Sequence, residues 1–210
     1  MGKCIITRKG GTNSNAITLD TVPYINCHTS GIITDIHLSA NYKIEVKFDA
    51  ETYNNDECIF GTIAGYSATH LTLYNNKYYI GCGSNEFSFG TYSSGDHIFI
   101  YNDELSRCVF DGTVVRENVN VTVDTNKTYT IGCRTSKTSN VFQGKLYYLK
   151  FTDKTTGDVV CNFIPIYQQI ETSCEKGNIG FTLVISGCYD TINNKFYKAD
   201  DWDYISGDEG

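Results

Sequence analysis

Every second side chain is apolar over long stretches of this chain, and no other feature constrains its fold as strongly. The alternation is clearest between residues 42 and 51 and recurs at 32–38 and 118–124. Successive side chains of a β-strand point to opposite faces of a sheet, so these segments are predicted to be strands with one face on a core and one in water. No window keeps a helical spacing of apolar residues over about ten positions, which argues against helices.

Pairs of turn-forming residues separate the apolar runs. Asn75-Asn76, Asp111-Gly112 and Asn193-Asn194 each stand beside strand-like segments. Both central residues of a type I′ hairpin turn need a positive φ, which Asn, Asp and Gly tolerate. The 16 Tyr, 11 Phe and 19 Gly suit pleated strands and tight turns. Many short strands joined by such turns predict one all-β domain, an antiparallel two-sheet sandwich.

The two ends of the chain differ in composition from the middle. We expect residues 1–20 to form an N-terminal arm or linker, or alternatively an extra edge strand, before a sandwich that spans 21–199. Residues 200–210 are predicted to form an acidic tail around Trp202. The first twenty residues lack the apolar stretch of a signal peptide, so no cleaved leader is expected.

Charge and cysteine content exclude several classes of function. The net charge of −7, from 17 Lys and Arg against 24 Asp and Glu, disfavours nucleic acid and anionic membranes as partners. No stretch reaches the ~18 apolar residues of a membrane-spanning helix. The nine Cys are odd in number and include no Cys-x-x-Cys pair. We therefore expect neither a zinc knuckle nor a disulfide framework, but buried, reduced thiols in a protein made in a cytoplasm.

The last third of the chain carries a recognisable motif. Segment 144–151 begins Gly-Lys-Leu-Tyr, segment 160–165 ends Phe-Ile-Pro, and 187–197 contains Gly-Cys-Tyr-Asp followed by Asn-Asn-Lys-Phe-Tyr. This pattern resembles the concanavalin A-like sandwich domains, the LamG-like jelly-roll group common in proteins of bacteriophages and gut bacteria. Residues 22–25, 31–32 and 42–46 fit the opening strands of the same group, so the resemblance covers roughly residues 22–198.

The resemblance implies a jelly-roll sandwich whose closing hairpin is locked by aromatic side chains. We interpret the motif as a fold signature rather than a ligand site, because a fold does not by itself imply a function. Pro165 is expected to end strand hydrogen bonding. The signature residues are Phe163, Ile164, Pro165, Tyr189, Asp190, Phe196 and Tyr197.

Related sandwiches include β-glucan hydrolases, which place two carboxylates on one strand face. Glu45, Asp49 and Glu51 share a strand face here, but their spacing departs from the Glu-x-Asp-x-x-Glu pattern of those enzymes and Lys47 stands between two of them. We interpret them as a solvated charged face, and we predict no catalytic residue and no enzymatic activity.

No metal site is predicted either. The four His, at positions 28, 37, 70 and 97, lack the spacing of metal ligands. Loops 102–104 and 200–203 are rich in the oxygen ligands that Ca²⁺ takes, yet they match no fixed ligand pattern. Calcium therefore stays open as a cofactor, and no other cofactor is expected.

Aromatic residues near turns are the candidate ligand contacts. Sugars bind by stacking their apolar faces on aromatic rings while polar groups hold their hydroxyls. The candidates are Tyr66, Tyr74, Tyr92, Tyr101 and Trp202. The alternative is that these rings fill the core and its rim, and Trp202 has a third interpretation as an anchor onto a neighbouring subunit.

The sequence thus favours a non-enzymatic bacteriophage virion protein, such as a capsid decoration, head fibre or tail-associated subunit. Its partners would be other virion proteins, copies of itself and host or mucus glycans, with weak contacts raised by many copies on one particle. The alternatives are a glycan-binding module of a bacterial surface protein and a glucanase-type hydrolase. The expected locations are accordingly the virion or the bacterial cell surface.

Overall fold

The computed structural model describes residues 3–6, 17–37, 41–51, 56–62, 69–82, 85–119, 127–172 and 181–203. Within these ranges the chain forms strands and turns and no helix. For 3–6, 17–19, 82, 169–172 and 181–183 only the backbone is described.

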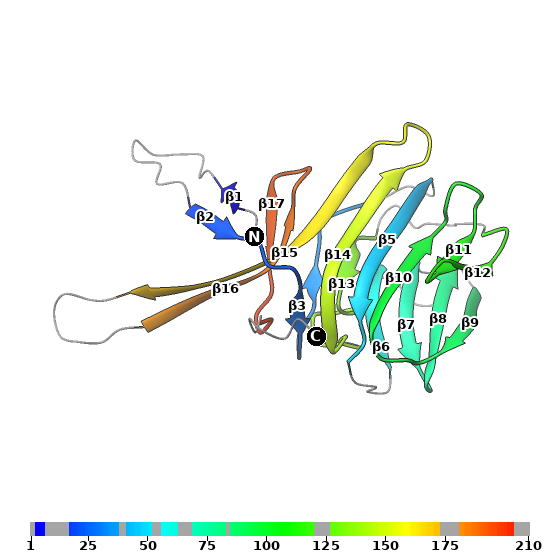
Figure 1. Cartoon of the computed structure of the whole chain (residues 1–210), viewed down its shortest axis with the longest axis horizontal. Helices are drawn as coiled ribbons and strands as arrows, with labels where there is room; N and C mark the ends of the chain where they lie inside the picture. The colour runs from blue at the N-terminus through cyan, green and yellow to red at the C-terminus, as the bar shows by residue number, and fades with distance from the viewer. Residues whose placement is uncertain are drawn as a thin grey trace.

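The strands form two antiparallel sheets and a separate hairpin, as Figure 1 shows. The large sheet has the order β12 (Thr113–Arg116), β11 (Cys108–Phe110), β10 (Asp96–Tyr101), β5 (Tyr42–Asp49), β14 (Gly144–Asp153), β15 (Val159–Thr172), β16 (Phe181–Asp190) and β17 (Lys195–Lys198), with β3 (Ile25–Cys27) also paired to β14. The small sheet has the order β4 (Ile32–Ile33), β13 (Tyr129–Ile131), β6 (Glu57–Thr62), β7 (His70–Tyr74), β8 (Lys77–Cys82) and β9 (Asn85–Thr91). The hairpin pairs β1 (Lys3–Ile6) with β2 (Ile17–Asp20).

The two sheets pack face to face around an aromatic core, so the prediction of an all-β two-sheet sandwich is confirmed. On β5, Ile44, Val46 and Phe48 are buried while the residues between them are partly exposed, which is the alternation seen in the sequence. Fully buried large side chains come from both sheets and from the loops; they include Phe60, Tyr78, Phe99, Tyr101, Phe142, Phe151, Phe163 and Trp202. Burying such rings is worth about 1.5–3 kcal/mol each, which makes this core the main source of stability.

Strand β14 is the centre of the large sheet. One of its edges pairs with β5 along nearly its whole length. The other edge is shared, because β3 pairs with Gly144 to Leu146 and β15 pairs with Leu149 to Thr152. The first strand of the sandwich and one of its last strands therefore meet on the same edge of β14.

Backbone geometry confirms the turns predicted at Asn75-Asn76 and Asp111-Gly112, while at Asn193-Asn194 the first residue lacks the positive φ of a type I′ turn. Asn75 and Asn76 have φ of 47° and 60°, and Asp111 and Gly112 have φ of 47° and 77°. These are the left-handed values that both central residues of a type I′ turn require. Asn194 also has a positive φ, of 52°, in the turn between β16 and β17.

The strand predicted at 32–38 is much shorter than its sequence pattern indicates. Only Ile32 and Ile33 are paired as β4. The hydroxyl of Thr34 donates to the carbonyl oxygen of Tyr129 at 2.8 Å, and the N–H of Ile36 donates to that hydroxyl at 3.2 Å. The Thr34 hydroxyl thus forms hydrogen bonds that backbone groups would form in a regular ladder, and the regular strand ends there. Most of the strand predicted at 118–124 lies outside the described residues.

Pro165 does not end its strand, contrary to expectation, because β15 continues to Thr172. The carbonyl oxygen of Pro165 accepts a hydrogen bond from the N–H of Val22, so it points away from β16. The N and the C=O of one strand residue point to the same side, and the missing N–H of Pro165 therefore removes no bond from the β15–β16 ladder.

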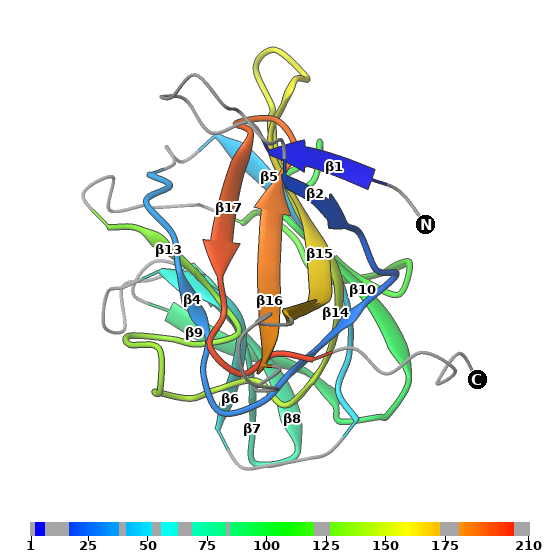
Figure 2. The same cartoon turned by 90° about the vertical axis from the view of Figure 1, so that its left-hand side faces the viewer.

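The ends of the sandwich lie close together in space. Asn26 of β3 and Asp203 exchange backbone hydrogen bonds of 2.8 and 3.2 Å, so the acidic segment begins in contact with the sandwich. Beyond the sandwich, β15 and β16 run on as a paired two-stranded ribbon that projects from one end of the large sheet in Figure 1. Figure 2 shows β15, β16 and β17 side by side at that end, near the β1–β2 hairpin.

Six cysteines, at positions 27, 58, 108, 133, 161 and 188, are buried and free, which agrees with the prediction of reduced thiols. Burial raises the pKa of Cys133 and of Cys161 to about 12. Across the described ranges, we find no helix long and apolar enough to cross a membrane.

Candidate functional site

A polar pocket of about 420 Å³ opens where three distant parts of the chain meet. The turn after β3, the start of β6 and the loop between β13 and β14 supply its walls. Its lining residues are Thr29, Asp56, Glu57, Thr138, Asn140, Val141 and Gln143. The volume falls within the range of about 300–1,000 Å³ that is typical of small-ligand sites.

Glu57 is the buried acid of this pocket, with 1% of its side chain surface exposed. Its Oε2 accepts a hydrogen bond from the backbone N–H of Gln143 at 3.1 Å. A buried carboxylate is costly unless donors compensate it, so this bond ties the β13–β14 loop to the start of β6. The carboxylate is thereby held in one place on the pocket wall.

Two residues with left-handed backbone shape the pocket rim. Asp56 has a φ of 75° and Asn140 a φ of 53°. The side-chain amide of Asn140 donates to the backbone carbonyl oxygen of Asp56 at 3.3 Å, and the backbone carbonyl oxygen of Asn140 accepts from the N–H of Cys58 at 2.8 Å. Asp and Asn are among the few non-glycine types that tolerate this conformation. The rim is therefore fixed by its own backbone and not by a ligand.

Two neighbouring tyrosines, one exposed and one partly buried, lie on the strands β7 and β8 that follow β6 in the small sheet. Glu57 pairs with Leu73 in the β6–β7 ladder, so Tyr74 stands beside Asp56 at the end of the neighbouring strand. Tyr74 is 43% exposed, and its ring centroid lies 6.1 Å from that of Tyr79 on β8. The outer face of the small sheet thus carries two adjacent rings, whereas Glu57 shares the core-facing side of the sheet with its register partner Leu73.

Three other predicted aromatic contacts, Tyr92, Tyr101 and Trp202, do not line this pocket. Tyr101 and Trp202 are 0% and 1% exposed, so both lie in the core, where no ligand can stack on them, and the prediction of exposed rings is wrong for these two. Tyr92 is partly buried and donates to the carbonyl oxygen of Ala50 at 2.8 Å. Tyr66 lies outside the described residues.

The three acids compared above with a hydrolase site each have a neighbouring hydrogen-bond donor or ion-pair partner. Glu45 accepts from the hydroxyl of Tyr148 at 2.8 Å and pairs with Lys150 at 3.1 Å. Glu51 pairs with Lys145 at 3.1 Å. Asp49 accepts from the N–H of Gly95 at 2.9 Å.

A bulge in β14 gives this outer face its aromatic content. The register with β5 shifts between Leu146 and Tyr148, so both Tyr147 and Tyr148 turn outward while Leu146 and Leu149 stay buried. The hydroxyl of Tyr147 donates to Asp96 at 2.5 Å, and the ammonium of Lys47 lies 4.2 Å from its ring centroid. This ring is already covered by a cation, which leaves less of it for a sugar than Tyr74 offers.

The fold-signature residues close the end of the large sheet. Phe163 packs edge-on against Tyr197 at a centroid distance of 5.6 Å, and Tyr189 is buried. Asp190 is fully buried and accepts from the N–H groups of Asn162 and Ile192, each at 3.0 Å. Ile164 and Phe196 pack against a small cluster around Ile166, and Pro165 is buried beside them.

Acids and histidines of the loops have protein partners of their own. Asp103 accepts from the N–H groups of Leu105 and Arg107, each at 2.9 Å, and Asp201 accepts from the hydroxyl of Ser30 at 2.6 Å. His28 pairs with Asp203 at 3.0 Å and His97 with Asp111 at 2.8 Å. Over the part of the chain that the structure describes, no three His, Cys, Asp or Glu side chains gather as metal ligands do.

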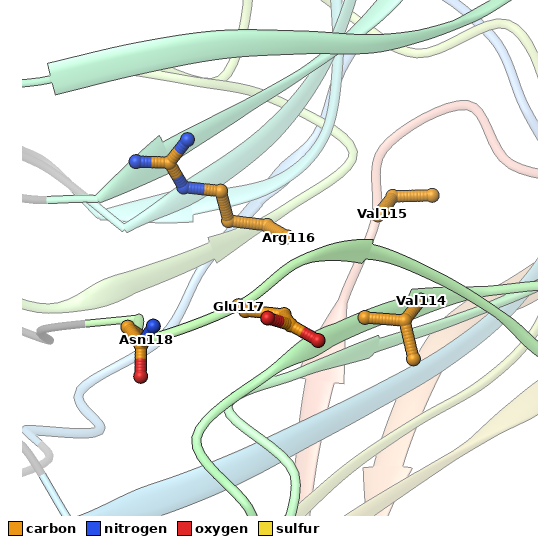
Figure 3. A pocket seen from close by; sticks show the side chains of 5 residues that line it. All are labelled: Val114, Val115, Arg116, Glu117 and Asn118. Carbon is orange, nitrogen blue, oxygen red and sulfur yellow. The ribbon is translucent and has the colours of Figure 1, made fainter.

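A second open pocket, of about 550 Å³, lies along β12 and is lined by Val114 to Asn118 (Figure 3). Arg116, the exposed last residue of β12, has its guanidinium carbon 3.8 Å from the centroid of the Phe87 ring on β9. The side chain of Arg116 thus spans from β12 to β9, the edge strands of the two sheets. This pocket is the weaker candidate for a ligand site, because the Arg116 side chain that lines it already packs on Phe87.

Tyr74 is exposed, as its place beside a predicted turn indicates, whereas the pocket was not predicted from the sequence. Its residues are far apart in the chain and belong to no motif. The available signal was two turn-forming residues, Asp56 and Asn140. Each stands just before one partner of the Cys58–Val141 bridge. A search against protein families and a search of curated proteins both return no match.

Proposed function

We propose that this chain is a non-enzymatic carbohydrate-binding sandwich that serves as a structural protein of a bacteriophage virion. The binding half rests on the polar pocket of Glu57 and on the Tyr74–Tyr79 ring pair, whose Tyr74 ends the strand next to β6. The virion half rests on the resemblance of residues 22–198 to concanavalin A-like jelly-roll domains. The two-sheet sandwich is compatible with that family.

The chemistry of the pocket suits a ligand rich in hydroxyl groups. Asp56 offers carboxylate oxygens as acceptors, Gln143 offers an amide, and Thr138 offers a hydroxyl that both donates and accepts. An adjacent aromatic ring supplies the apolar contact that a sugar face requires. A ligand would lie with its hydroxyls toward the pocket and one face on Tyr74.

Charge narrows the class of sugar. Two carboxylates on the pocket wall repel an anionic ligand, so sialic acids and uronic acids are disfavoured. Neutral hexoses and amino sugars meet no such penalty. The proposed ligand is therefore a neutral or cationic saccharide.

Binding is tested by screening a multivalent form of the protein on a glycan array, followed by titration of the strongest sugar. Tyr74→Ala and Thr138→Ala should each weaken binding about tenfold, which corresponds to about 1.4 kcal/mol. Leu105→Ala and Thr113→Ala alter exposed residues away from the pocket and serve as matched controls. A flat array, or equal affinity of all four variants, would overturn the proposal.

The virion half has its own test. An antibody against the folded chain should label purified phage particles from the source culture at many copies per particle. Labelling of the bacterial envelope instead would favour the alternative, a glycan-binding module of a cell-surface protein.

A further inference from the structure

The projecting ribbon of β15 and β16 has a strand edge that no other described strand covers at residues 181–185. β17 pairs with Gly187 to Asp190 of β16, and the N–H of Ala199 donates to the carbonyl oxygen of Ser186 at 2.9 Å. Beyond these contacts, no strand among the described residues pairs with the outer edge of β16 at 181–185. Figure 1 shows this ribbon extending away from both sheets.

The other edge strands of the sandwich carry the features that block edge pairing. β9 has Glu86, β12 has Arg116, and β17 has Lys195 and Lys198, whereas β4 is only two residues long. Charged side chains and short edges are the usual protections against pairing with another chain. These edge strands are therefore protected against pairing with a strand of another chain.

The edge of β16 lacks these protections. Residues 181–185 read Phe-Thr-Leu-Val-Ile, with no charge and no proline, and Val184 is 40% exposed. These residue types favour β-structure, and an isolated two-stranded ribbon is marginally stable in water. Pairing with an additional strand would therefore stabilise this ribbon more than it would stabilise the other edges.

We propose that this edge pairs with the same edge of a second copy and makes a two-fold symmetric dimer. Antiparallel self-pairing of 181–185 is centred on Leu183, which stands opposite Leu183 of the other copy, and Thr182 then stands opposite Val184. The chain carries a net charge of −7, yet this register opposes no two charges. The product is a continuous four-stranded sheet built from two ribbons, and it closes as a two-fold interface must.

This interface uses none of the residues that line the polar pocket, so the two proposals stand or fall separately. If both hold, each dimer carries two pockets, and binding to a surface with many sugars gains from the paired sites. The pairing also gives the chain a route to multiple copies on a particle that needs no additional protein.

The test is the mass of the full chain in solution, measured by light scattering over a range of concentrations. The expected value is twice the 23.5 kDa of one chain. Leu183→Lys and Leu183→Glu should each give a monomer, because each places two like charges opposite one another. An equal mixture of the two variants should recover the dimer, which shows that both variants are folded.

Gln169→Lys is the matched control, since Gln169 is the register partner of Val184 on the other strand of the ribbon. It should remain dimeric. A monomeric wild-type chain would overturn the proposal, and so would a dimer that survives both Leu183 variants. A dimer lost in Gln169→Lys but kept in Leu183→Lys would place the contact on β15 and overturn it as well.

Discussion

The indole N–H of Trp202 donates a hydrogen bond to the carbonyl oxygen of Ser30 at 2.6 Å. The two residues are separated by most of the chain, and the bond ties the acidic segment to the turn after β3. The ring also fills the core next to Gly132, where a Cβ atom would lie 3.1 Å from it. Trp202 is therefore part of what holds the two ends of the sandwich together.

Trp202→Ala should lower the free energy of unfolding by about 3–5 kcal/mol, the usual cost of deleting a buried aromatic ring. Trp202→Phe should cost less, because it keeps most of the ring volume and loses the hydrogen bond. Urea unfolding followed by circular dichroism measures both. Leu105→Ala, at a residue that is 68% exposed, is the control and should change stability by less than about 0.5 kcal/mol. Equal effects of Trp202→Ala and Leu105→Ala would contradict the packing described above.

Gly144→Ala should destabilise the protein by about 1–3 kcal/mol, the cost of overpacking a tight site. A Cβ atom at this position would lie 2.2 Å from the backbone oxygen of Asp49 and 2.6 Å from the Phe142 ring. The backbone oxygen cannot move without disturbing the β5–β14 ladder. Gly90→Ala is the comparison, since its Cβ would meet only Tyr78 at 3.8 Å. Thermal unfolding should separate the two variants, and identical melting temperatures would contradict this account.

The six buried thiols should resist alkylation in the native protein and react once urea is added. Reactivity depends on the thiolate, and burial raises the pKa of Cys133 and of Cys161 to about 12. Peptide mapping by mass spectrometry assigns each labelled cysteine. Rapid native labelling of Cys58 or Cys188 would show that the core is more open than described.

Stability should fall as the pH rises above the ordinary thiol pKa of 9.0 toward about 12. In that window the folded state keeps protons that the unfolded state has lost, so deprotonation favours unfolding. Burial and the neighbouring Asp96 raise the pKa of Tyr147 in the same direction. Urea titrations at increasing pH in the presence of a reductant test this. Cys133→Ala and Cys161→Ala should flatten the slope, and an unchanged slope in both would assign the effect to the remaining buried thiols and the tyrosines.

Local patterns predicted much of the architecture. The alternation of β5 and the left-handed pairs Asn75-Asn76 and Asp111-Gly112 act within a few residues, so sequence alone reveals them. The bulge at Tyr147 was not predicted, although two buried leucines three positions apart in one strand, Leu146 and Leu149, break the two-residue period.

Tertiary contacts decided what the local patterns could not. Trp202 stands in an acidic, tail-like segment, and only its contact with Ser30 shows that it belongs to the core. The pocket escaped prediction for the same reason, because Thr29, Glu57 and Gln143 become neighbours only when three loops meet. The exposure of Tyr74 could be predicted because a ring beside an Asn-Asn turn lies at the surface for local reasons alone.

The shared edge of β14 sets an order of events for a chain as it is synthesised. Cys27 of β3 pairs with Gly144, and Asn26 pairs with Asp203, so both partners are synthesised long after β3. Ladders that close such long loops form late, since the entropy of the intervening chain opposes them until many contacts form together. During synthesis β3 therefore stays without its partners on β14 until residue 146 has left the ribosome, and Asn26 stays without its second partner until residue 203 has done so.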